Sequence, residues 1–300
     1  MTGAAELAPP RAPVDEWVRE AWSHAPAVGS VEVEGATISY RGWSLDRDDL
    51  PGVLLAHGFQ AHARWWDHIA PWLATRHRVV AVDFSGFGDS GHRRAYSRAQ
   101  HGRELLAVAD AVGFERPAIV AHSYGSLPAL DACLVAPERV ARAILIEMWL
   151  GVLDGDPVEM PASRNRVQPD LDTALGRYRL APPGGWPEPA ILDHVARHSF
   201  REVKEVDDAG GGWALKFDGD AATSLNACPS SAMYRAVTVP LSYVHGDRSD
   251  VVDAADIARC QELLATCGPP IAIPLAHHHV MLEQPVALVV ALTALLASPV

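Results

Sequence analysis

Six short apolar runs, separated by segments of helical length, constrain the fold of this chain more than any other feature of its sequence. Each run is almost continuously apolar, which is typical of strands that are buried on both faces. The runs cover residues 53–56, 79–82, 118–121, 143–146, 241–244 and 271–274. Helix-like segments lie at about 63–75, 97–113, 124–136, 253–266 and 284–298. Alternating strands and helices predict an α/β fold with a doubly wound, mostly parallel sheet.

The alternation of strands and helices stops between residues 148 and 235. Proline and glycine become frequent there, and helical patterns at 171–178 and 191–201 replace the apolar strands. We therefore predict that 148–235 is a mostly helical lid inserted into the sheet domain, and not an independent domain. The core of that domain is expected to comprise residues 31–147 and 236–300.

The N-terminal part of the chain differs from the core in composition. Residues 1–30 are rich in Ala, Pro and Glu and have no apolar segment after a basic start, which argues against a signal peptide. We treat them as an extension, either an arm or a tail. Residues 31–40 alternate apolar with polar around Gly35, which predicts a β-hairpin.

Composition and charge exclude several classes of partner. A chain of 300 residues with 49% hydrophobic and 21% charged residues fits a soluble globular protein. Its formal net charge of −12 disfavours binding to nucleic acid. The longest apolar stretch, 286–297, has about 12 residues, whereas a membrane helix needs roughly 20, so no membrane partner is expected. The sequence leaves open whether the chain forms a homo-oligomer.

Cysteine usage points to a reducing compartment. The four cysteines are Cys133, Cys228, Cys260 and Cys267, and none of them forms a CxxC pair or a zinc-type spacing. Such isolated thiols behave as small buried hydrophobic residues. We therefore expect reduced cysteines and a cytoplasmic protein.

The chemistry centres on Ser123. Residues 118–126 read A-I-V-A-H-S-Y-G-S, an apolar strand that enters a helix through a serine with small residues two positions before and after it. A sharp turn of this kind exposes the serine Oγ above the sheet, and large side chains at the flanking positions would collide across the turn. The alternative is a serine that caps the helix N-terminus.

An acidic turn and a histidine follow in the chain order that such a nucleophile requires. The strand at 241–244 leads into H-G-D-R-S-D at 245–250, and the last strand leads into three histidines at 277–279. All three elements follow strands, and open α/β sheets place their sites at the carboxyl ends of strands. The sequence therefore predicts a serine, histidine and carboxylate triad.

The chain resembles the α/β-hydrolase superfamily over roughly residues 31–300. Besides the serine turn, residues 53–60 resemble the family's HG-containing oxyanion loop, and 83–90 resemble its D-x-x-G-x-G-x-S loop. The spacing G-x-x-x-D at 246–250 and the ending H-x(4)-E-x-P at 278–285 complete the set. The resemblance implies the fold and a catalytic triad, and it leaves the substrate open.

The resemblance also assigns roles to single residues. It implies Ser123 as nucleophile and selects His278 as base, with His279 as second choice, and it implies Asp250 as acid. Glu147 and Asp247 remain alternatives for the acid. The expected oxyanion hole uses the backbone N–H groups of Phe59 and Tyr124. Tyr124 is also a candidate to line the pocket through its side chain. Candidates for the pocket wall are Trp65, Trp66 and Trp213.

Several other polar residues are expected to be structural. His57 and Asp83 should shape loops, and His122 should be a buried strand residue. The histidines at 277–279 point in different directions from one turn, so we expect no metal site. Most arginines of the predicted lid should be solvated or paired, with contact to an anionic substrate as the alternative for one of them. They are Arg164, Arg166, Arg177, Arg179, Arg197 and Arg201.

A serine nucleophile separates this chain from relatives that use Asp, namely haloalkane dehalogenases and epoxide hydrolases, and from dienelactone hydrolases, which use Cys. The implied reaction is hydrolysis of a small-to-medium, fairly apolar carboxylic ester or lactone without a cofactor. One alternative is a C–C bond hydrolase of the ring-cleavage type. Another is a cyclase, lyase or transacylase of secondary metabolism, and a third is a binding protein on a hydrolase scaffold.

Overall fold

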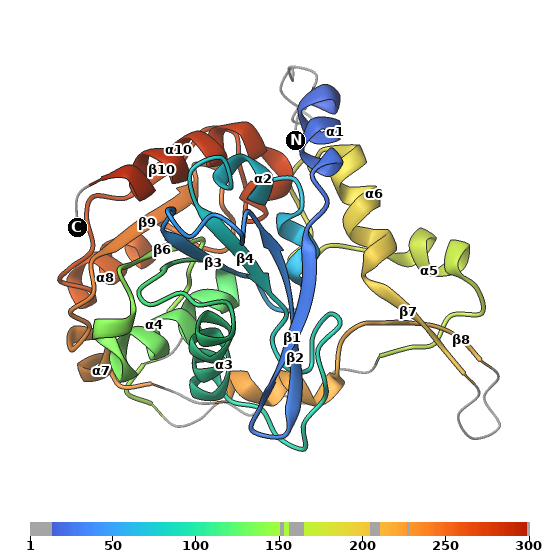
Figure 1. Ribbon diagram of the computed structural model, residues 1–300, viewed down its shortest axis with the longest axis horizontal. Helices are drawn as coiled ribbons and strands as arrows, with labels where there is room; N and C mark the ends of the chain where they lie inside the picture. The colour runs from blue at the N-terminus through green and yellow to red at the C-terminus, as the bar shows by residue number, and fades with distance from the viewer. Residues whose placement is uncertain (1–13, 151–152, 156–164, 205–210, 227–228, 299–300) are drawn as a thin grey trace, which may run out of the picture.

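The computed structural model describes residues 14–150, 153–155, 165–204, 211–226 and 229–298. Its main sheet has eight strands in the order β1-β2-β4-β3-β5-β6-β9-β10 (Figure 1). The strands are β1 (Ala27–Val33), β2 (Ala36–Trp43), β3 (Gly52–Ala56), β4 (Arg78–Val82), β5 (Ala118–His122), β6 (Arg142–Ile146), β9 (Leu241–Gly246) and β10 (Ile271–Ile273). The six strands from β4 to β10 in this order pair in parallel, and β2 pairs antiparallel with β1 and β4. The predicted fold class is confirmed.

The buried strands have opposite faces in two separate cores. In β3, Val53 and Leu55 belong to one apolar cluster, and Leu54 and Ala56 belong to the other. Successive side chains of a strand point to opposite faces, so a continuous apolar run is what a sheet covered on both sides requires. This burial explains why the strands do not alternate in sequence.

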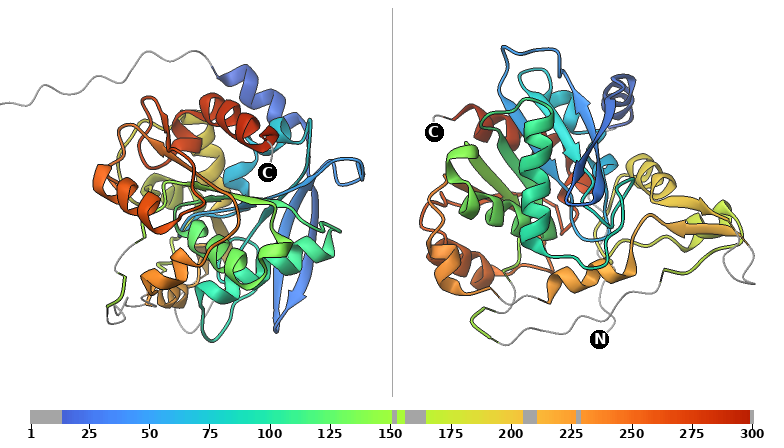
Figure 2. Two further views of the ribbon diagram at one scale, coloured as in Figure 1. Left: turned by 90° about the vertical axis from the view of Figure 1, so that its left-hand side faces the viewer. Right: turned by 60° about the horizontal axis from the view of Figure 1, so that its bottom comes forward.

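Helices cover both faces of the sheet. One face carries α3 (Arg98–Ala111), α4 (Ser126–Val135) and α8 (Ala254–Leu263), and the other carries α1 (Asp15–Ser23), α2 (Ala70–Leu73), α9 (Val280–Glu283) and α10 (Pro285–Ala297). Figure 2 shows the red α10 and the green α3 and α4 on opposite sides of the sheet. Within the described residues, no helix is both long and apolar enough to cross a membrane.

The expected helix at 63–75 is broken in the structure. A 3-10 turn, η1 (Ala63–Trp66), precedes the short helix α2. Pro71 stands in the first turn of α2, where a missing N–H is tolerated, but its ring would collide with the chain if the helix continued from η1. The apolar period alone did not show this interruption.

The N-terminal extension contributes ordered structure from residue 14 onward, whereas residues 1–13 lie outside the described part of the chain. Helix α1 packs on α2 through a stack of Trp17 on Trp72, with ring centroids 5.1 Å apart. The hairpin begins at Ala27, earlier than predicted, and the indole of Trp43 donates to the carbonyl of His24 over 3.0 Å. Aromatic contacts of this kind are not visible as a periodic pattern.

The segment between β6 and β9 contains α5 (Leu171–Arg177), α6 (Pro189–His198), a two-stranded sheet of β7 (Phe200–Val203) and β8 (Gly212–Leu215), the turn η4 (Gly219–Leu225) and α7 (Ser231–Arg235). We call it the inserted segment. In Figure 1, α5, α6, β7 and β8 project beyond the edge of the main sheet, whereas α7 lies beside α8. The small sheet was missed because each strand has only four residues, too few to display a period.

Helix α6 is fixed to the core by a buried carboxylate. Asp67 accepts from the Arg41 guanidinium over 2.8 and 3.2 Å, and His194 of α6 lies 3.0 Å from the same carboxylate. The ring of Trp22 stacks on His194 at 4.6 Å. A charge buried with its partners holds one geometry, because losing one partner leaves a charge without compensation.

Many histidines in the core are held neutral. Burial lowers the pKa of His68 to about 4, and it lowers the pKa of further buried histidines. They include His57, His62, His101, His122 and His279. Burial raises the pKa of three carboxyl groups, Asp83, Glu104 and Asp131. Their effect on the pH dependence of the unfolding free energy is opposite to that of the histidines. The histidines outnumber these carboxyl groups.

We expect the free energy of unfolding to fall as the pH is lowered from 7 towards 5. The unfolded chain binds protons at its histidines below about pH 6.5, whereas His68 in the folded chain does not until about pH 4. A buried neutral histidine therefore costs at most about 1.4 kcal/mol per pH unit in that window. His68→Gln should keep a donor for the carbonyl of Met281, which His68 contacts over 2.7 Å, and should make the pH dependence shallower. Urea unfolding at several pH values measures both.

The exposed His24 provides the matched control. It is exposed in the folded chain, so urea unfolding of His24→Gln at the same pH values shows what replacing a surface histidine does. An unchanged slope in His68→Gln would contradict the assignment of His68 as a buried neutral histidine.

Candidate active site

Ser123 lies at the turn between β5 and α4, in a conformation that few serines adopt. Its φ is +50°, in the left-handed region, where a non-glycine residue is uncommon and marks local strain. A Cβ on Gly125 would lie 2.5 Å from the carbonyl oxygen of His57. The small residue that the motif predicts at this position is therefore required by close approach of two backbones.

His278 lies between Ser123 and a carboxylate. Its Nε2 is 3.0 Å from Ser123 Oγ, and its Nδ1 is 3.0 Å from Oε2 of Glu147. A carboxylate can only accept, so Nδ1 carries a proton and Nε2 presents its lone pair to the serine hydroxyl. Serine, imidazole and carboxylate thus form one hydrogen-bonded chain, the arrangement that activates a serine for nucleophilic attack.

Glu147 is fully buried and its carboxylate is saturated with donors. It follows β6 with a φ of +53°, which turns the side chain back towards the end of β9. The backbone N–H of Gly246 donates to Oε1 over 2.7 Å, and Ser249 Oγ–H donates to Oε2 over 2.6 Å. These bonds fix the carboxylate against His278 Nδ1. Ser249 had no signal in the sequence.

The structure corrects the choice of acid. Asp250, which the sequence predicts as the acid, is exposed, and its carboxylate points towards Gly184 of the inserted segment. The turn after β9 places Ser249 and not Asp250 next to Glu147, and the place beside His278 Nδ1 is already taken. Asp247 accepts from the backbone N–H of Leu275 over 2.7 Å and fixes a loop. Glu147, the alternative from β6, is the carboxylate that His278 contacts.

The three consecutive histidines diverge as expected. His277 contacts the buried Glu283 over 3.0 Å, and His279 Nε2 lies 3.0 Å from the carbonyl of Pro182. His122 Nε2 lies 2.9 Å from the carbonyl of His278. A carbonyl only accepts, so His122 and His279 carry their proton on Nε2 and are neutral, and burial keeps their pKa values low. His122 therefore holds the backbone of the base.

The loop after β3 is fixed by residues that the sequence predicts as structural. Phe84 N–H donates to His57 Nε2 over 3.2 Å, so His57 Nδ1–H donates to the carbonyl of Gly58 over 2.7 Å. Asp83 accepts from the backbone N–H of Ala63 over 2.6 Å, and burial raises its pKa to about 6. Both side chains hold the loop that carries Phe59.

A cavity of about 190 Å³ opens onto Ser123. We call it the catalytic cavity. It is lined by Gly58, Phe59, Ala61, Trp65, His122, Ser123, Ala181, Pro182, Val251, His278 and His279. Phe59 lines this cavity together with Ser123. Tyr124 turns its side chain into the core, where its hydroxyl lies 2.6 Å from His101 Nδ1, so its ring is not part of the cavity wall.

The predicted pocket residues separate. Trp65 lines the catalytic cavity. Trp66 is fully buried in the core beneath η1, because the 3-10 turn points consecutive side chains in different directions. Trp213 lies in β8 opposite Gln168 and lines neither of the cavities near the site. The prediction for Trp66 is therefore wrong, whereas that for Trp213 stays a prediction.

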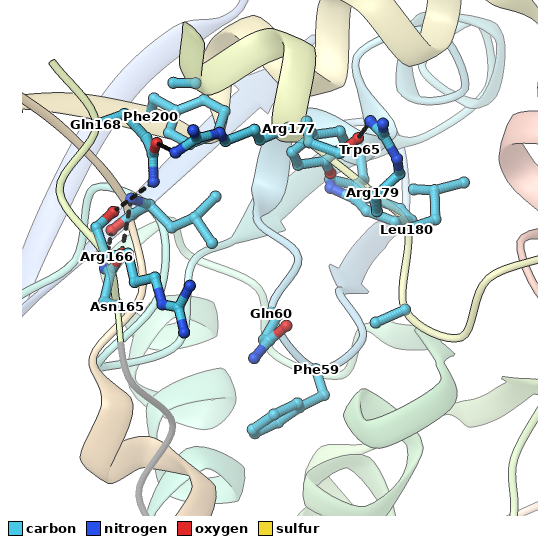
Figure 3. Close-up of a pocket in the computed structure, with 14 residues that line it drawn as sticks. Phe59, Gln60, Trp65, Asn165, Arg166, Gln168, Arg177, Arg179, Leu180 and Phe200 are labelled. Carbon is cyan, nitrogen blue, oxygen red and sulfur yellow. Dashed lines mark hydrogen bonds between the residues drawn. The ribbon is translucent and has the colours of Figure 1, made fainter. Parts of the chain in front are cut away.

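The arginines of the inserted segment also divide. Arg197 pairs with Asp193, and Arg201 lies near His92. Arg166, Arg177 and Arg179 line a second cavity next to the catalytic one (Figure 3). Arg164 lies outside the described residues.

Two of the cysteines, Cys133 and Cys260, are buried free thiols, and Cys228 lies outside the described residues. In the described part of the chain, no cluster of His, Cys, Asp and Glu has the arrangement of a metal site.

Comparison with known proteins gives a consistent picture. The sequence profile of a family described as "alpha/beta hydrolase fold" matches residues 51–206. Epoxide hydrolase A of Mycobacterium tuberculosis is 26% identical over 284 residues, which cover 78% of this chain and 87% of that protein.

Two solved structures of hydrolytic enzymes share the fold. The thioesterase domain from the curacin biosynthetic pathway superimposes with a TM-score of 0.73 at 22% identity, covering 90% of this chain and 99% of that domain. An esterase from Mycobacterium tuberculosis superimposes with a TM-score of 0.70 at 21% identity, covering 95% of this chain and 96% of that one.

A fluorophosphonate probe, which labels activated serines, should modify the wild type and not Ser123→Ala. Glu147→Gln should label roughly 10²–10⁴-fold more slowly, because an amide can donate to Nδ1 and stabilises the wrong imidazole tautomer. Asp250→Asn is the matched control and should label at nearly the original rate. Slow labelling of Asp250→Asn together with normal labelling of Glu147→Gln would return the acid to Asp250.

Proposed function

Because this chain belongs to the α/β-hydrolase fold family, we propose that it is a serine hydrolase that cleaves a carboxylic ester or lactone through an acyl-enzyme. The observation that carries the proposal is the continuous hydrogen-bonded chain from Ser123 through His278 to Glu147. The bond formed first joins Ser123 Oγ to the carbonyl carbon of the substrate, and His278 Nε2 takes the serine proton.

The carbonyl oxygen becomes an oxyanion in this step. In our proposal it accepts hydrogen bonds from the backbone N–H groups of Phe59 and Tyr124. Glu147 stabilises the imidazolium of His278, which then gives its proton to the leaving alcohol oxygen as the C–O bond breaks. A water molecule then gives a proton to the same imidazole and attacks the acyl carbon. The bond from that carbon to Ser123 Oγ breaks, His278 returns the proton to Oγ, and the acid is released.

The walls of the catalytic cavity support an apolar substrate around the scissile bond. Besides the triad and the loop after β3, its lining consists of Trp65, Ala181, Pro182 and Val251 together with His122 and His279. A volume of about 190 Å³ is below the usual range of roughly 300–1,000 Å³ for ligand sites. We therefore propose a small-to-medium ester, with the inserted segment at 148–235 acting as the lid over the site.

The epoxide hydrolase relative does not set the reaction that we propose. The resemblance of the chain to its family implies Asp at the nucleophile position of such enzymes, and this chain has Ser123 there. A serine alkoxide forms an acyl-enzyme with a carbonyl compound, which favours ester hydrolysis. The buried free thiols Cys133 and Cys260 support a reducing, cytoplasmic location as part of the same proposal.

Esters of p-nitrophenol from acetate to decanoate test the proposal. We expect the wild type to hydrolyse short and medium chains, with a decline once the acyl chain outgrows the catalytic cavity, and we expect Ser123→Ala to release no nitrophenolate above background. Folded protein that reacts with the fluorophosphonate probe and yet hydrolyses none of these esters would overturn the ester assignment.

A further inference from the structure

A second cavity, of about 260 Å³, lies between the inserted segment and the loop after β3. We call it the arginine pocket. Figure 3 shows Arg166, Arg177 and Arg179 on the side of the inserted segment and Phe59 and Gln60 on the facing side. The remaining lining residues are Trp65, Asn165, Gln168, Ala174, Tyr178, Leu180, Ala181, Phe200 and Leu215.

The charge of the arginine pocket is opposite to that of the protein. Three guanidinium groups line it and no acidic residue does, although the chain as a whole has a formal net charge of −12. Among the described residues, no carboxylate forms an ion pair with Arg166, Arg177 or Arg179. Several guanidinium groups elsewhere pair with carboxylates, as Arg93 does with Glu104 and Arg98 with Asp131. Concentrated positive charge in a cavity attracts anions.

Two of the three guanidinium groups are held in place by the inserted segment. Arg177 donates to Oε1 of the buried Gln168. The backbone of Gln168 pairs in both directions with Trp213 over 2.7 Å, which fixes it to β8. Arg179 donates to the carbonyl oxygens of Gly176 and Tyr178 over 3.0 and 2.6 Å. Each of these contacts uses only part of a guanidinium group that carries five N–H donors.

The arginine pocket adjoins the site of chemistry. Phe59, Trp65 and Ala181 line both this pocket and the catalytic cavity that contains Ser123 and His278. A substrate that extends past these shared walls would have its carbonyl group at Ser123 and its far end among the arginines. The catalytic cavity has mainly apolar walls and fits an apolar part of a molecule, whereas the arginine pocket fits an anionic part.

We propose that the substrate carries an anionic group, a carboxylate or a phosphate, several bonds from the scissile carbonyl, and that Arg166, Arg177 and Arg179 bind this group. The inference rests on the proposed ester hydrolysis and adds its substrate class. Planar guanidinium groups match carboxylate and phosphate oxygens in geometry as well as charge. Their contacts hold the remote end of the substrate and leave the reacting atoms to Ser123 and His278.

Matched ester pairs test the proposal. On the acyl side, mono-4-nitrophenyl esters of diacids from succinate to suberate are compared with neutral esters in which an isopropyl group replaces the carboxylate. On the alcohol side, we use hexanoate esters of 4-hydroxybenzoate and of phosphorylated alcohols that carry no nitrophenyl group. Each is compared with the same ester in which the carboxylate or phosphate is methylated. We expect the wild type to prefer the anionic member of at least one series, roughly five- to thirtyfold in kcat/KM, mainly through a lower KM.

Variants assign the preference to the pocket. Arg166→Gln, Arg177→Gln and Arg179→Gln should each lower the ratio of kcat/KM for the anionic ester to that for its neutral partner, and Arg177→Lys should retain part of it. Arg197→Gln is the matched control, because Arg197 also belongs to the inserted segment but pairs with Asp193 outside the pocket. Added salt should reduce the ratio in the wild type.

Binding without turnover separates the two proposals. Calorimetric titration of Ser123→Ala with the preferred anionic ester should show weaker binding when Arg177→Gln is added. If neutral esters are hydrolysed and no anionic ester is preferred in either series, the anion proposal is wrong and the serine hydrolase stands. If the anionic esters bind with dependence on the arginines but no ester is cleaved, the pocket stands and ester hydrolysis is wrong.

Discussion

The carboxylate of Glu147 is the constraint on which the rest of the site depends. It joins the end of β6 to the end of β9 through Gly246 and Ser249, and it joins both to the loop after β10 through His278. Such a buried carboxylate is stable only with its donors in place. Those donors lie at the carboxyl ends of neighbouring parallel strands. The position of the base therefore depends on the order of the strands in the sheet.

Local features of the sequence predicted much of this arrangement. The strands could be predicted because burial on both faces leaves continuous apolar runs. Ser123 could be predicted because its turn needs Gly125 close to the backbone of His57. The acid could not be predicted from such a local feature. Asp250 and Glu147 both follow strands, and which of them contacts His278 depends on how β6, β9 and the turn containing Ser249 lie together. That is a property of packing, which spacing along the chain does not encode.

The inserted segment shows the same division between local and tertiary information. Its helices show a helical spacing of apolar residues in the sequence. The strands β7 and β8 are too short to show any spacing and are held together by pairing between distant residues. The separation of Trp65 from Trp66 followed from a 3-10 turn that only the position of Pro71 hinted at. The arginines could be counted in the sequence, but their gathering around one cavity required the fold of α5 and the bridge between Gln168 and Trp213.

The neutral histidines beside the base also follow from burial. His122 and His279 each use Nε2–H on a backbone carbonyl, and burial lowers their pKa values, so neither carries a proton on both nitrogens near neutral pH. In the proposed reaction a positive charge develops on His278, whose ring centroid lies 4.9 Å from that of His122. Charged neighbours at that distance would oppose it. Neutral neighbours leave Glu147 as the charged group in direct contact with the base, and its attraction then favours the imidazolium without an opposing charge next to it.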